Sequence, residues 1–316
     1  MRYVGFDVGG TKCAVTVATV ENGRVTFEGK RAFPTPEAWQ EAVEQMFCAA
    51  EELLGDKRAD ACGFSCGSPL DAEKGIVLAP PNLPTWDHVP VTELARARFG
   101  IPAFLENDAN ACALAEWRWG AGRGVDNMIF LTFGTGMGAG LILGGRLIRG
   151  ANGNAGEVGH MRLAEFGPAG YGKEGSFEGF CSGGGVKQLG VTLGKRAVQS
   201  GTHPAYFAGD WEAVSAKTIA QAAQAGDETA REVYRLCGER LGQALSVLVD
   251  VLNPDRIVIG SIYARSGELL EEAMQRVLWR ECLPQNLAVA RVVPAELGET
   301  LGDCAALCVA EYGLTR

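Results

Sequence analysis

The chain has 316 residues, which on the usual size of a folding unit corresponds to about two domains. A hydrophobic fraction of 47% and a charged fraction of 21% are typical of a globular protein with a large core. The formal net charge of -9 gives no basic surface for nucleic acid or an anionic membrane, so neither is an expected partner. No run approaches the roughly 18 consecutive apolar residues of a membrane helix.

Ten cysteines are scattered along the chain, mostly within apolar strand or helix patterns. The pairs Cys62/Cys66 and Cys304/Cys308 lack the spacing and partners of a zinc site. The first residues, MRYVGFDVGG, enter a strand directly and show no signal peptide. We therefore expect reduced, buried thiols and a cytoplasmic location.

Strand and helix patterns follow one another along the chain. The expected strands, besides those of two hairpins described next, are residues 24–33, 61–66, 101–105, 256–260 and 288–293. The expected helices are one that Thr35 caps and Gly55 ends, residues 94–99, 111–119, 215–225 and 228–252, one that Ser266 caps, and residues 302–312. This order predicts an α/β protein.

Two hairpins share one design. Residues 3–18 and residues 129–143 both read as an apolar strand, a Gly-rich turn with a threonine, and a second apolar strand. Glycine leaves backbone N–H groups uncovered, so such a turn can hold an anion such as phosphate. The alternative is that the glycines only turn the chain. The repetition, and Asp7 beside the first turn, favour a pair of turns that grip one polyphosphate.

Polar residues gather at three later places. The segment APPNLPTW (79–86) is stiffened by three prolines and holds Asn82, unless it is simply a rigid surface loop. The strand that ends near residue 105 delivers Asn107 and Asp108 to a helix start, where Asp108 is either a helix cap or a general base. The loop 149–160 and the Gly-rich stretch after it contain Glu157, His160 and Glu178, whose side chains suit sugar hydroxyls.

With these motifs in order, the chain resembles the ROK family of bacterial sugar kinases and repressors, which have the hexokinase/actin-like fold. The matching segments are DVGGTK (7–12), APPNLPTW (79–86), ENDANACALAE (106–116), GTGMGAGLI (134–142), RGANGNAGEVGH (149–160), LNPDRIVIG (252–260) and LGDCAAL (301–307). They cover nearly the whole chain, so the resemblance does not depend on any one hairpin.

The resemblance implies two α/β domains with an active-site cleft between them. We expect residues 1–118, completed by the C-terminal helix 301–316, to form the small domain and residues 119–300 the large one. The family's site would then map onto this chain as follows. Asp108 would be the general base. The sugar would be bound by Asn82, Asn107, Asp108, Glu157, His160 and Glu178. ATP would be held by Asp7, Gly9, Gly10, Thr11, Lys12, Gly134, Thr135, Gly136, Gly138 and Gly260. Asp7 would also position Mg²⁺ through water.

One departure from the family concerns zinc. Many members follow the histidine with a Cys-x-Cys-Gly-x-x-Gly-Cys-x-Glu pattern, and the histidine and three cysteines bind structural zinc. In this chain the three cysteine positions are Ala169, Tyr171 and Ser176, while Glu178 is retained. One histidine is too few ligands for a zinc ion, so we expect no structural zinc. Packing, with Tyr171 and Phe177 as candidates, must then hold the loop.

A second departure follows the strand 256–260. The family has two or three glycines there, whereas this chain reads Gly260-Ser261-Ile262-Tyr263. The added side chains could narrow the nucleotide pocket or stack on the base, which bears on nucleotide affinity and preference.

The predicted function is ATP- and Mg²⁺-dependent phosphorylation of a hexose or N-acetylhexosamine, at O6, by a homodimer that binds neither nucleic acid nor membrane. Phosphoryl transfer needs positioning and charge compensation, which two turns, a metal ion and one carboxylate supply. The alternative is a sugar-binding sensor or regulator of the same fold without turnover. Acyl or phosphate transfer by another actin-like enzyme is a third reading, which the sugar-loop matches disfavour.

Overall fold

The computed structural model describes residues 1–315, which form two compact units. Unit 1 consists of Met1–Val125, Gly140–Ala155 and the segment from Glu296 onward, and unit 2 consists of Asp126–Ala139 and Gly156–Ala295. The domain boundaries expected from the sequence stay a prediction. Within residues 1–315, no helix has both the length and the apolar character that crossing a membrane requires.

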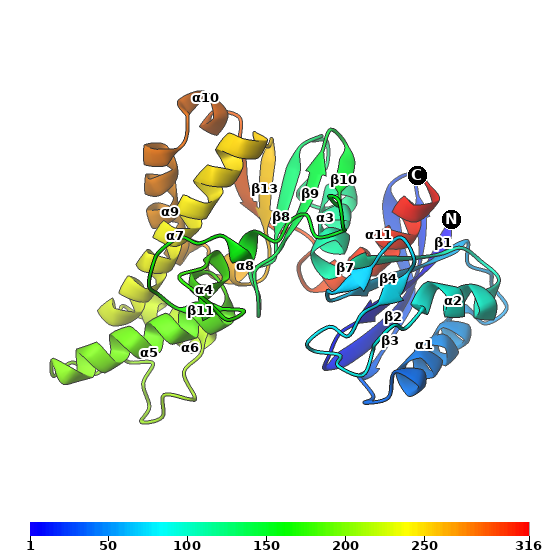
Figure 1. The fold of residues 1–316 in the computed structure, drawn as a ribbon, viewed down its shortest axis with the longest axis horizontal. Coiled ribbons are helices and arrows are strands. Elements are labelled where there is room, and N and C mark those ends of the chain that lie inside the picture. The colour runs from blue at the N-terminus through cyan, green and yellow to red at the C-terminus, as the bar shows by residue number, and fades with distance from the viewer. Residues whose placement is uncertain (316) are drawn as a thin grey trace. The chain divides into compact units, whose positions relative to one another are not determined.

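Unit 1 is built on a five-stranded sheet with the order β3-β2-β1-β4-β7 (Figure 1). Its strands are β1 Arg2–Val8, β2 Lys12–Glu21, β3 Arg24–Pro34, β4 Ala61–Cys66 and β7 Ala103–Asn107. β1, β4 and β7 are parallel, and Val8 pairs with Cys66, which pairs with Asn107. The carboxyl ends of these three strands therefore meet at one edge of the sheet, the usual place for ligands in α/β folds.

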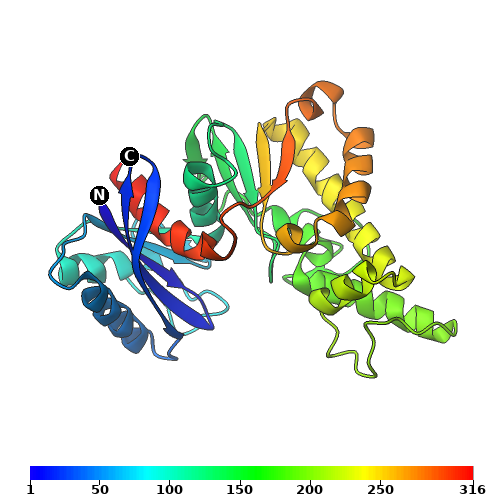
Figure 2. The same ribbon diagram turned by 180° about the vertical axis from the view of Figure 1, so that it is seen from behind.

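Helices cover both faces of this sheet. The helices and minor elements of unit 1 are α1 Trp39–Leu54, α2 Val91–Phe99, α3 Asp108–Trp119, η2 Gly298–Thr300, α11 Leu301–Leu314, and the hairpins β5 Leu70–Asp71/β6 Ile76–Val77 and β9 Ala139–Leu143/β10 Arg146–Ile148. The ring centroids of Phe6 and Phe64 lie 4.5 Å apart in a stacked pair. Phe6 also contacts Phe47 of α1, so this pair lies on the sheet face that α1 covers. On the opposite face, a Cβ at Gly63 would overlap the Ala306 carbonyl of α11, drawn in red in Figure 2.

Unit 2 contains three parallel strands, β8 Met128–Leu131, β13 Arg256–Ile259 and β14 Arg291–Pro294, with β13 in the middle. Its other elements are η1 Val158–His160, β11 Ala169–Gly170, β12 Lys173–Glu174, α4 Phe177–Phe180, α5 Gly183–Gln199, α6 Ala216–Gln224, α7 Glu228–Leu252, α8 Ile262–Ser266, α9 Glu268–Glu281 and α10 Pro284–Leu287. Gly238 and Gly242 let α7 approach α9 closely, because a Cβ at either would press on an α9 carbonyl.

Two predicted helix starts are wrong. The helix that Thr35 was expected to cap begins at Trp39, because Thr35 is used elsewhere: its hydroxyl donates to the Gly9 carbonyl at 2.6 Å. Ser266 does not cap a helix either, because it is the last residue of α8 and α9 begins at Glu268. In both cases a polar residue with capping chemistry was assigned a local role that the structure does not give it.

Candidate active site

The first Gly/Thr turn joins β1 to β2 at the sheet edge of unit 1. The Gly9 N–H donates to the Lys12 carbonyl at 3.1 Å, and the Thr35 N–H donates to the Thr11 carbonyl at 3.1 Å. The turn is thus held by the Gly9 N–H and by two of its carbonyl groups, and Gly10, Thr11 and Lys12 are exposed. This leaves a braced turn with a lysine beside it, an arrangement that suits a bound phosphate.

The Pro-rich loop packs against this turn. A Cβ at Gly10 would overlap the backbone carbonyl of Asn82, so the contact requires glycine. Trp86 is fully buried beneath the loop and its carbonyl accepts from the Ala79 N–H at 2.8 Å. Asn82 itself is exposed. The loop therefore holds Asn82 in a fixed position beside the turn.

Asp7 lies next to the turn, where the charges of Asp303 and Asp108 act on its carboxylate. Burial, Asp303 and Asp108 raise the pKa of Asp7 to about 6, while Lys30 and Lys12 oppose the rise. Asp303 is held by Lys30 at 2.6 Å and by the Thr16 hydroxyl at 3.1 Å. Residues 1–315 hold no group of three His, Cys, Asp or Glu ligands, so Asp7 suits at most a hydrated Mg²⁺ ion that keeps most of its water.

At the start of α3, Asn107 is the N-cap and Asp108 is the first helical residue. The N-cap is Asn107, whose Oδ1 accepts from the Asn110 N–H at 2.8 Å. Asp108 is the first residue of the helix, so the helix-cap alternative for Asp108 does not hold. Asp108 is exposed, and its Oδ1 accepts from the Ala109 N–H at 2.8 Å. The start of the helix thus orients the carboxylate of a solvent-exposed residue.

An ion pair between the buried Glu106 and the half-buried Arg149 supports this helix start. Glu106 is 2% exposed and accepts from Arg149 Nε at 2.8 Å, from the Asn110 side chain at 3.0 Å and from the Asn107 N–H at 3.2 Å. Arg149 opens the loop 149–160, so the ion pair ties that loop to the Asn107–Asp108 segment. Glu106 and Arg149 belong to two different segments of the family resemblance, 106–116 and 149–160, so no local pattern indicates that they pair.

The second Gly/Thr turn lies in unit 2, after β8. Two hydrogen bonds between Thr132 and Gly138 close the turn. The Thr132 N–H donates to the Gly138 carbonyl at 3.0 Å, and the Thr132 hydroxyl accepts from the Gly138 N–H at 2.8 Å. The Met137 N–H donates to Glu178 Oε2 at 3.0 Å. Thr135 is exposed at the tip. Glu178, expected at the sugar, is thus also bonded to the expected phosphate turn.

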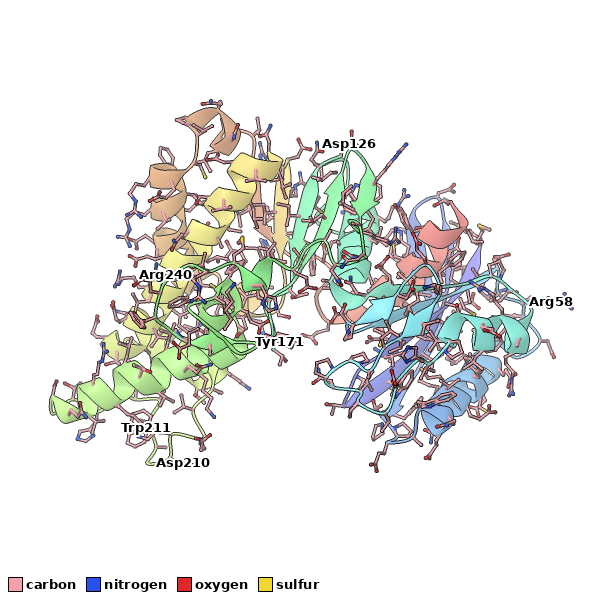
Figure 3. The ribbon with its side chains drawn as sticks, viewed as in Figure 1. Arg58, Asp126, Tyr171, Asp210, Trp211 and Arg240 are labelled. Atoms are coloured by element: carbon pink, nitrogen blue, oxygen red, sulfur yellow. The ribbon has the colours of Figure 1, made fainter. Side chains whose placement is uncertain are left out.

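The segment from His160 to Phe177, where the family resemblance would place zinc ligands, is held here by protein groups. Lys173 Nζ donates to the His160 carbonyl, and the rings of His160 and Tyr171 meet edge to face at 5.4 Å. The Phe177 N–H donates to the Met161 carbonyl at 2.8 Å, and Phe177 is fully buried. Tyr171 comes from the turn between β11 and β12, as Figure 3 shows.

Glu157 and His160 are both exposed at the two ends of this part of the loop. Their place near the second turn is set by glycines: the Gly156 carbonyl accepts from the Ala139 N–H at 2.8 Å, and a Cβ at Gly159 would overlap the Met137 carbonyl.

Across residues 1–315, no three His, Cys, Asp or Glu side chains are grouped as a metal site. His160 with Ala169, Tyr171 and Ser176 does not fit zinc, which needs about four nitrogen or sulfur ligands.

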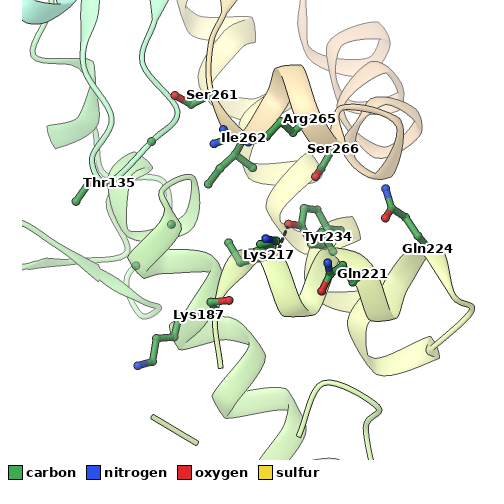
Figure 4. Close-up of a pocket in the computed structure, with 16 residues that line it drawn as sticks. Thr135, Lys187, Lys217, Gln221, Gln224, Tyr234, Ser261, Ile262, Arg265 and Ser266 are labelled. Atoms are coloured by element: carbon green, nitrogen blue, oxygen red, sulfur yellow. Dashed lines mark hydrogen bonds between the residues drawn. The ribbon is translucent and has the colours of Figure 1, made fainter. Parts of the chain in front are cut away.

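A cavity of about 1010 Å³ opens beside the second turn in unit 2 (Figure 4). Its lining includes Gly134 and Thr135 of the turn, Gly183 and Gly184 at the start of α5, Lys187, Ser215, Ala216, Lys217, Ala220, Gln221, Gln224, Tyr234, Ser261, Ile262, Arg265 and Ser266. This volume is at the upper end for small-molecule sites and is large enough for a nucleotide. Gly260 comes just before Ser261, at the end of β13.

The sequence reasoning did not find the α6 wall of this cavity. Lys217, Gln221 and Gln224 line it, and their spacing of four and three residues places them on one face of a helix. That spacing is the signal in the sequence, and by itself it is ambiguous because polar residues on one helix face usually meet solvent.

Two α/β units with Gly/Thr turns and a nucleotide-sized cavity define the hexokinase/actin-like fold class. A ROK family glucokinase from Streptomyces griseus, solved in complex with glucose and AMPPNP, matches with a TM-score of 0.78 at 30% identity, covering 99% of this chain and 100% of that one. The glucokinase of Thermotoga maritima is 30% identical over 96% of this chain and 95% of its own length. A putative xylose repressor from Caldicellulosiruptor is 31% identical over 97% of this chain and 77% of its own.

The ROK family model matches residues 3–311. The chain therefore belongs to the ROK family, as its motifs predicted.

Proposed function

We propose that this protein is a sugar kinase that transfers the γ-phosphoryl group of ATP to a hydroxyl of a hexose or N-acetylhexosamine, at O6. The observation that carries the proposal is the pair at the start of α3, where Asn107 caps the helix and leaves Asp108 exposed at its first position. The likeness to glucokinases over nearly the whole chain supports the same reaction class.

Asp108 is the proposed general base. Its carboxylate would accept the proton of the attacking hydroxyl as the bond to phosphorus forms, a role that typically contributes about 10²–10⁴-fold to a rate. The helix start orients this carboxylate through the Ala109 N–H at 2.8 Å. The Glu106–Arg149 pair fixes the backbone on which it sits.

ATP is the proposed phosphoryl donor. The cavity in unit 2 would take the nucleoside, with Gly260 beside it, and Gly134, Thr135, Gly136 and Gly138 would hold phosphates. Gly9, Gly10, Thr11 and Lys12 would hold phosphates from unit 1. Asp7 would hold Mg²⁺ through water, and the ion would neutralise charge on the phosphates.

The sugar is proposed to bind Asn82, Asn107, Glu157, His160 and Glu178 as well as Asp108. These side chains offer both donors and acceptors, which recognition of uncharged hydroxyl groups requires. Because Asn107 uses its Oδ1 for the helix cap, its NH₂ group is the part that can donate to a hydroxyl. Selection among sugars would follow from such single hydrogen bonds.

Two further parts of the proposal concern assembly and location. Five large apolar side chains are exposed on adjoining elements of unit 2: Val247 and Val251 on α7, Trp279 on α9, and Leu283 and Val289 on either side of α10. An apolar surface of this kind suits contact with a second copy, so we propose a homodimer. All ten cysteines are free thiols, which fits a cytosolic location.

A sensor or regulator without turnover is the second candidate, favoured by the 31% identity to a putative xylose repressor. Such a protein would bind sugar without needing the carboxylates of Asp7 and Asp108, and both are present here. Their retention is the reason for preferring the kinase.

The test is release of ADP from ATP and Mg²⁺ in the presence of glucose, mannose, allose, fructose, N-acetylglucosamine or N-acetylmannosamine. The proposal predicts turnover with at least one of these sugars and formation of the 6-phosphate, identified by NMR of the product. Sugar binding by calorimetry without turnover on any of them would favour the sensor.

A further inference from the structure

Ser261 has a backbone conformation that serine rarely adopts. It lies between β13 and α8 with φ 49° and ψ −106°. This combination matches the first central position of a type II′ turn, where glycine is the usual residue because a Cβ is strained there. A serine at this position lowers stability relative to glycine.

The strain persists because both neighbours of Ser261 are fixed. The Gly260 N–H donates to the Leu131 carbonyl at 3.0 Å, and the Ile262 N–H donates to the Phe133 carbonyl at 2.9 Å. Both acceptors belong to β8 and the segment that leads into the second Gly/Thr turn. The Gly260 carbonyl also accepts from the Tyr263 N–H at 3.2 Å, so the peptide groups on either side of Ser261 keep their orientation, and its φ and ψ follow from them.

The Ser261 side chain is exposed and faces the cavity. Serine at a helix start usually accepts from the helix N–H groups, but Ser261 makes no such cap bond to α8. Instead its Oγ lies 3.5 Å from the point where a Cβ on Gly134 would stand. Figure 4 shows Ser261 and Thr135 at the same end of the cavity, away from Gln224.

That end of the cavity has the features of an anion site. The Gly/Thr turn supplies backbone groups, and α5, a helix of 17 residues, begins there with Gly183 and the exposed Gly184. The Gly183 N–H donates to the Gly134 carbonyl at 2.8 Å, which joins the helix start to the turn. Lys187 lines the same cavity one turn further along α5, where its Nζ is paired with the Glu212 carboxylate at 3.0 Å, so the backbone groups are the main feature of this end.

We propose that the Ser261 hydroxyl donates a hydrogen bond to a phosphate oxygen of the bound nucleotide, a contact that glycine at this position cannot make. The inference rests on the proposed function in one respect, that the cavity binds a nucleotide. The strained backbone is then retained because it aims the hydroxyl at the phosphates.

The test compares Ser261→Gly, which removes both hydroxyl and strain, with Ser261→Ala, which removes only the hydroxyl. Calorimetry with ADP and with adenosine measures binding, and thermal unfolding measures stability. Both variants are expected to bind ADP about 10-fold more weakly, the effect of one hydrogen bond to a charged group, and to bind adenosine as the parent does. Ser261→Gly, but not Ser261→Ala, is expected to raise the melting temperature.

Asn22→Gly is the matched control. Asn22 has φ 51° in the β2–β3 hairpin of unit 1, so this variant changes a positive-φ residue outside the cavity and should bind ADP normally. Unchanged ADP binding by Ser261→Ala, or an equal loss with adenosine, would overturn the phosphate contact. Parent protein that does not bind ADP would overturn the contact and the kinase together. Ser261-dependent ADP binding without sugar turnover would overturn the kinase alone.

Discussion

Glu178 Oε2 accepts a hydrogen bond from the Met137 N–H at 3.0 Å, across 41 residues of sequence. A Cβ at Gly136 would stand 2.9 Å from the same oxygen. One carboxylate proposed to bind sugar is therefore also part of the turn proposed to hold phosphates. Substitutions that keep or remove the acceptor at Oε2 separate the two proposed roles.

Glu178→Gln should keep the bond to Met137, because the Gln carbonyl still accepts, but should lose the charge that binds the sugar. We expect the sugar KM to rise about 10–100-fold with little change in the KM for ATP. Glu178→Ala loses both contacts, so both KM values should rise. Steady-state kinetics with each substrate varied in turn measures this, and equal behaviour of the two variants would contradict the shared role.

Asn107 also has two roles that substitution can separate, the N-cap of α3 and the proposed contact with the sugar. Asn107→Asp retains a good N-cap for α3 but lacks the NH₂ donor, so it should keep the melting temperature and lose sugar affinity by about 10-fold or more. Asn107→Ala should lose sugar affinity and, in addition, about 1 kcal/mol of stability. Calorimetry and thermal unfolding are the two readouts. Normal sugar binding by Asn107→Asp would remove this residue from the proposed site.

The loop around His160 is predicted to work without zinc. Elemental analysis should find no stoichiometric zinc, and prolonged EDTA dialysis followed by Mg²⁺ should leave sugar affinity unchanged. Lys173→Met should weaken sugar binding, because Lys173 Nζ donates to the His160 carbonyl. Lys195→Met, which changes a surface lysine of α5, is the matched control. One tightly bound zinc ion per chain would contradict this account.

Glu28 predicts a pH dependence of stability in unit 1. Lys57 at 2.7 Å, with Arg2 and Thr19 each at 2.8 Å, lowers its pKa from 4.5 to about 2. A lowered pKa in the folded state stabilises the protein above the unfolded pKa, and the contribution disappears as pH falls from about 4.5 through about 2. Because Lys57 is half exposed, we expect only about 1–2 kcal/mol.

Glu28→Gln should therefore destabilise unit 1 by that amount at pH 7 and by progressively less as the pH falls through about 2. Urea unfolding of both proteins at several pH values measures the difference. A difference that stays constant across this range would show that the ion pairs add nothing through charge.

Sequence patterns predicted elements well where local periodicity decides the structure. The strand 61–66 and the helix 228–252 have the predicted bounds, because an apolar pattern runs through each and Asn253-Pro254 ends the second. The helix start predicted at Thr35 is wrong because the Thr35 hydroxyl donates to the distant Gly9 carbonyl and does not cap a local helix. The bond between Glu178 and Met137 depends on two distant segments meeting, which no local pattern reports.

The central claim is that Asp108 is the base of a sugar kinase. The most direct measurement is a single-turnover assay of Asp108→Asn with γ-labelled ATP and the preferred sugar, with calorimetry of the same variant. The account predicts that phosphoryl transfer slows by about 10²–10⁴-fold while the sugar still binds. Transfer at the parent rate with normal sugar binding would contradict it.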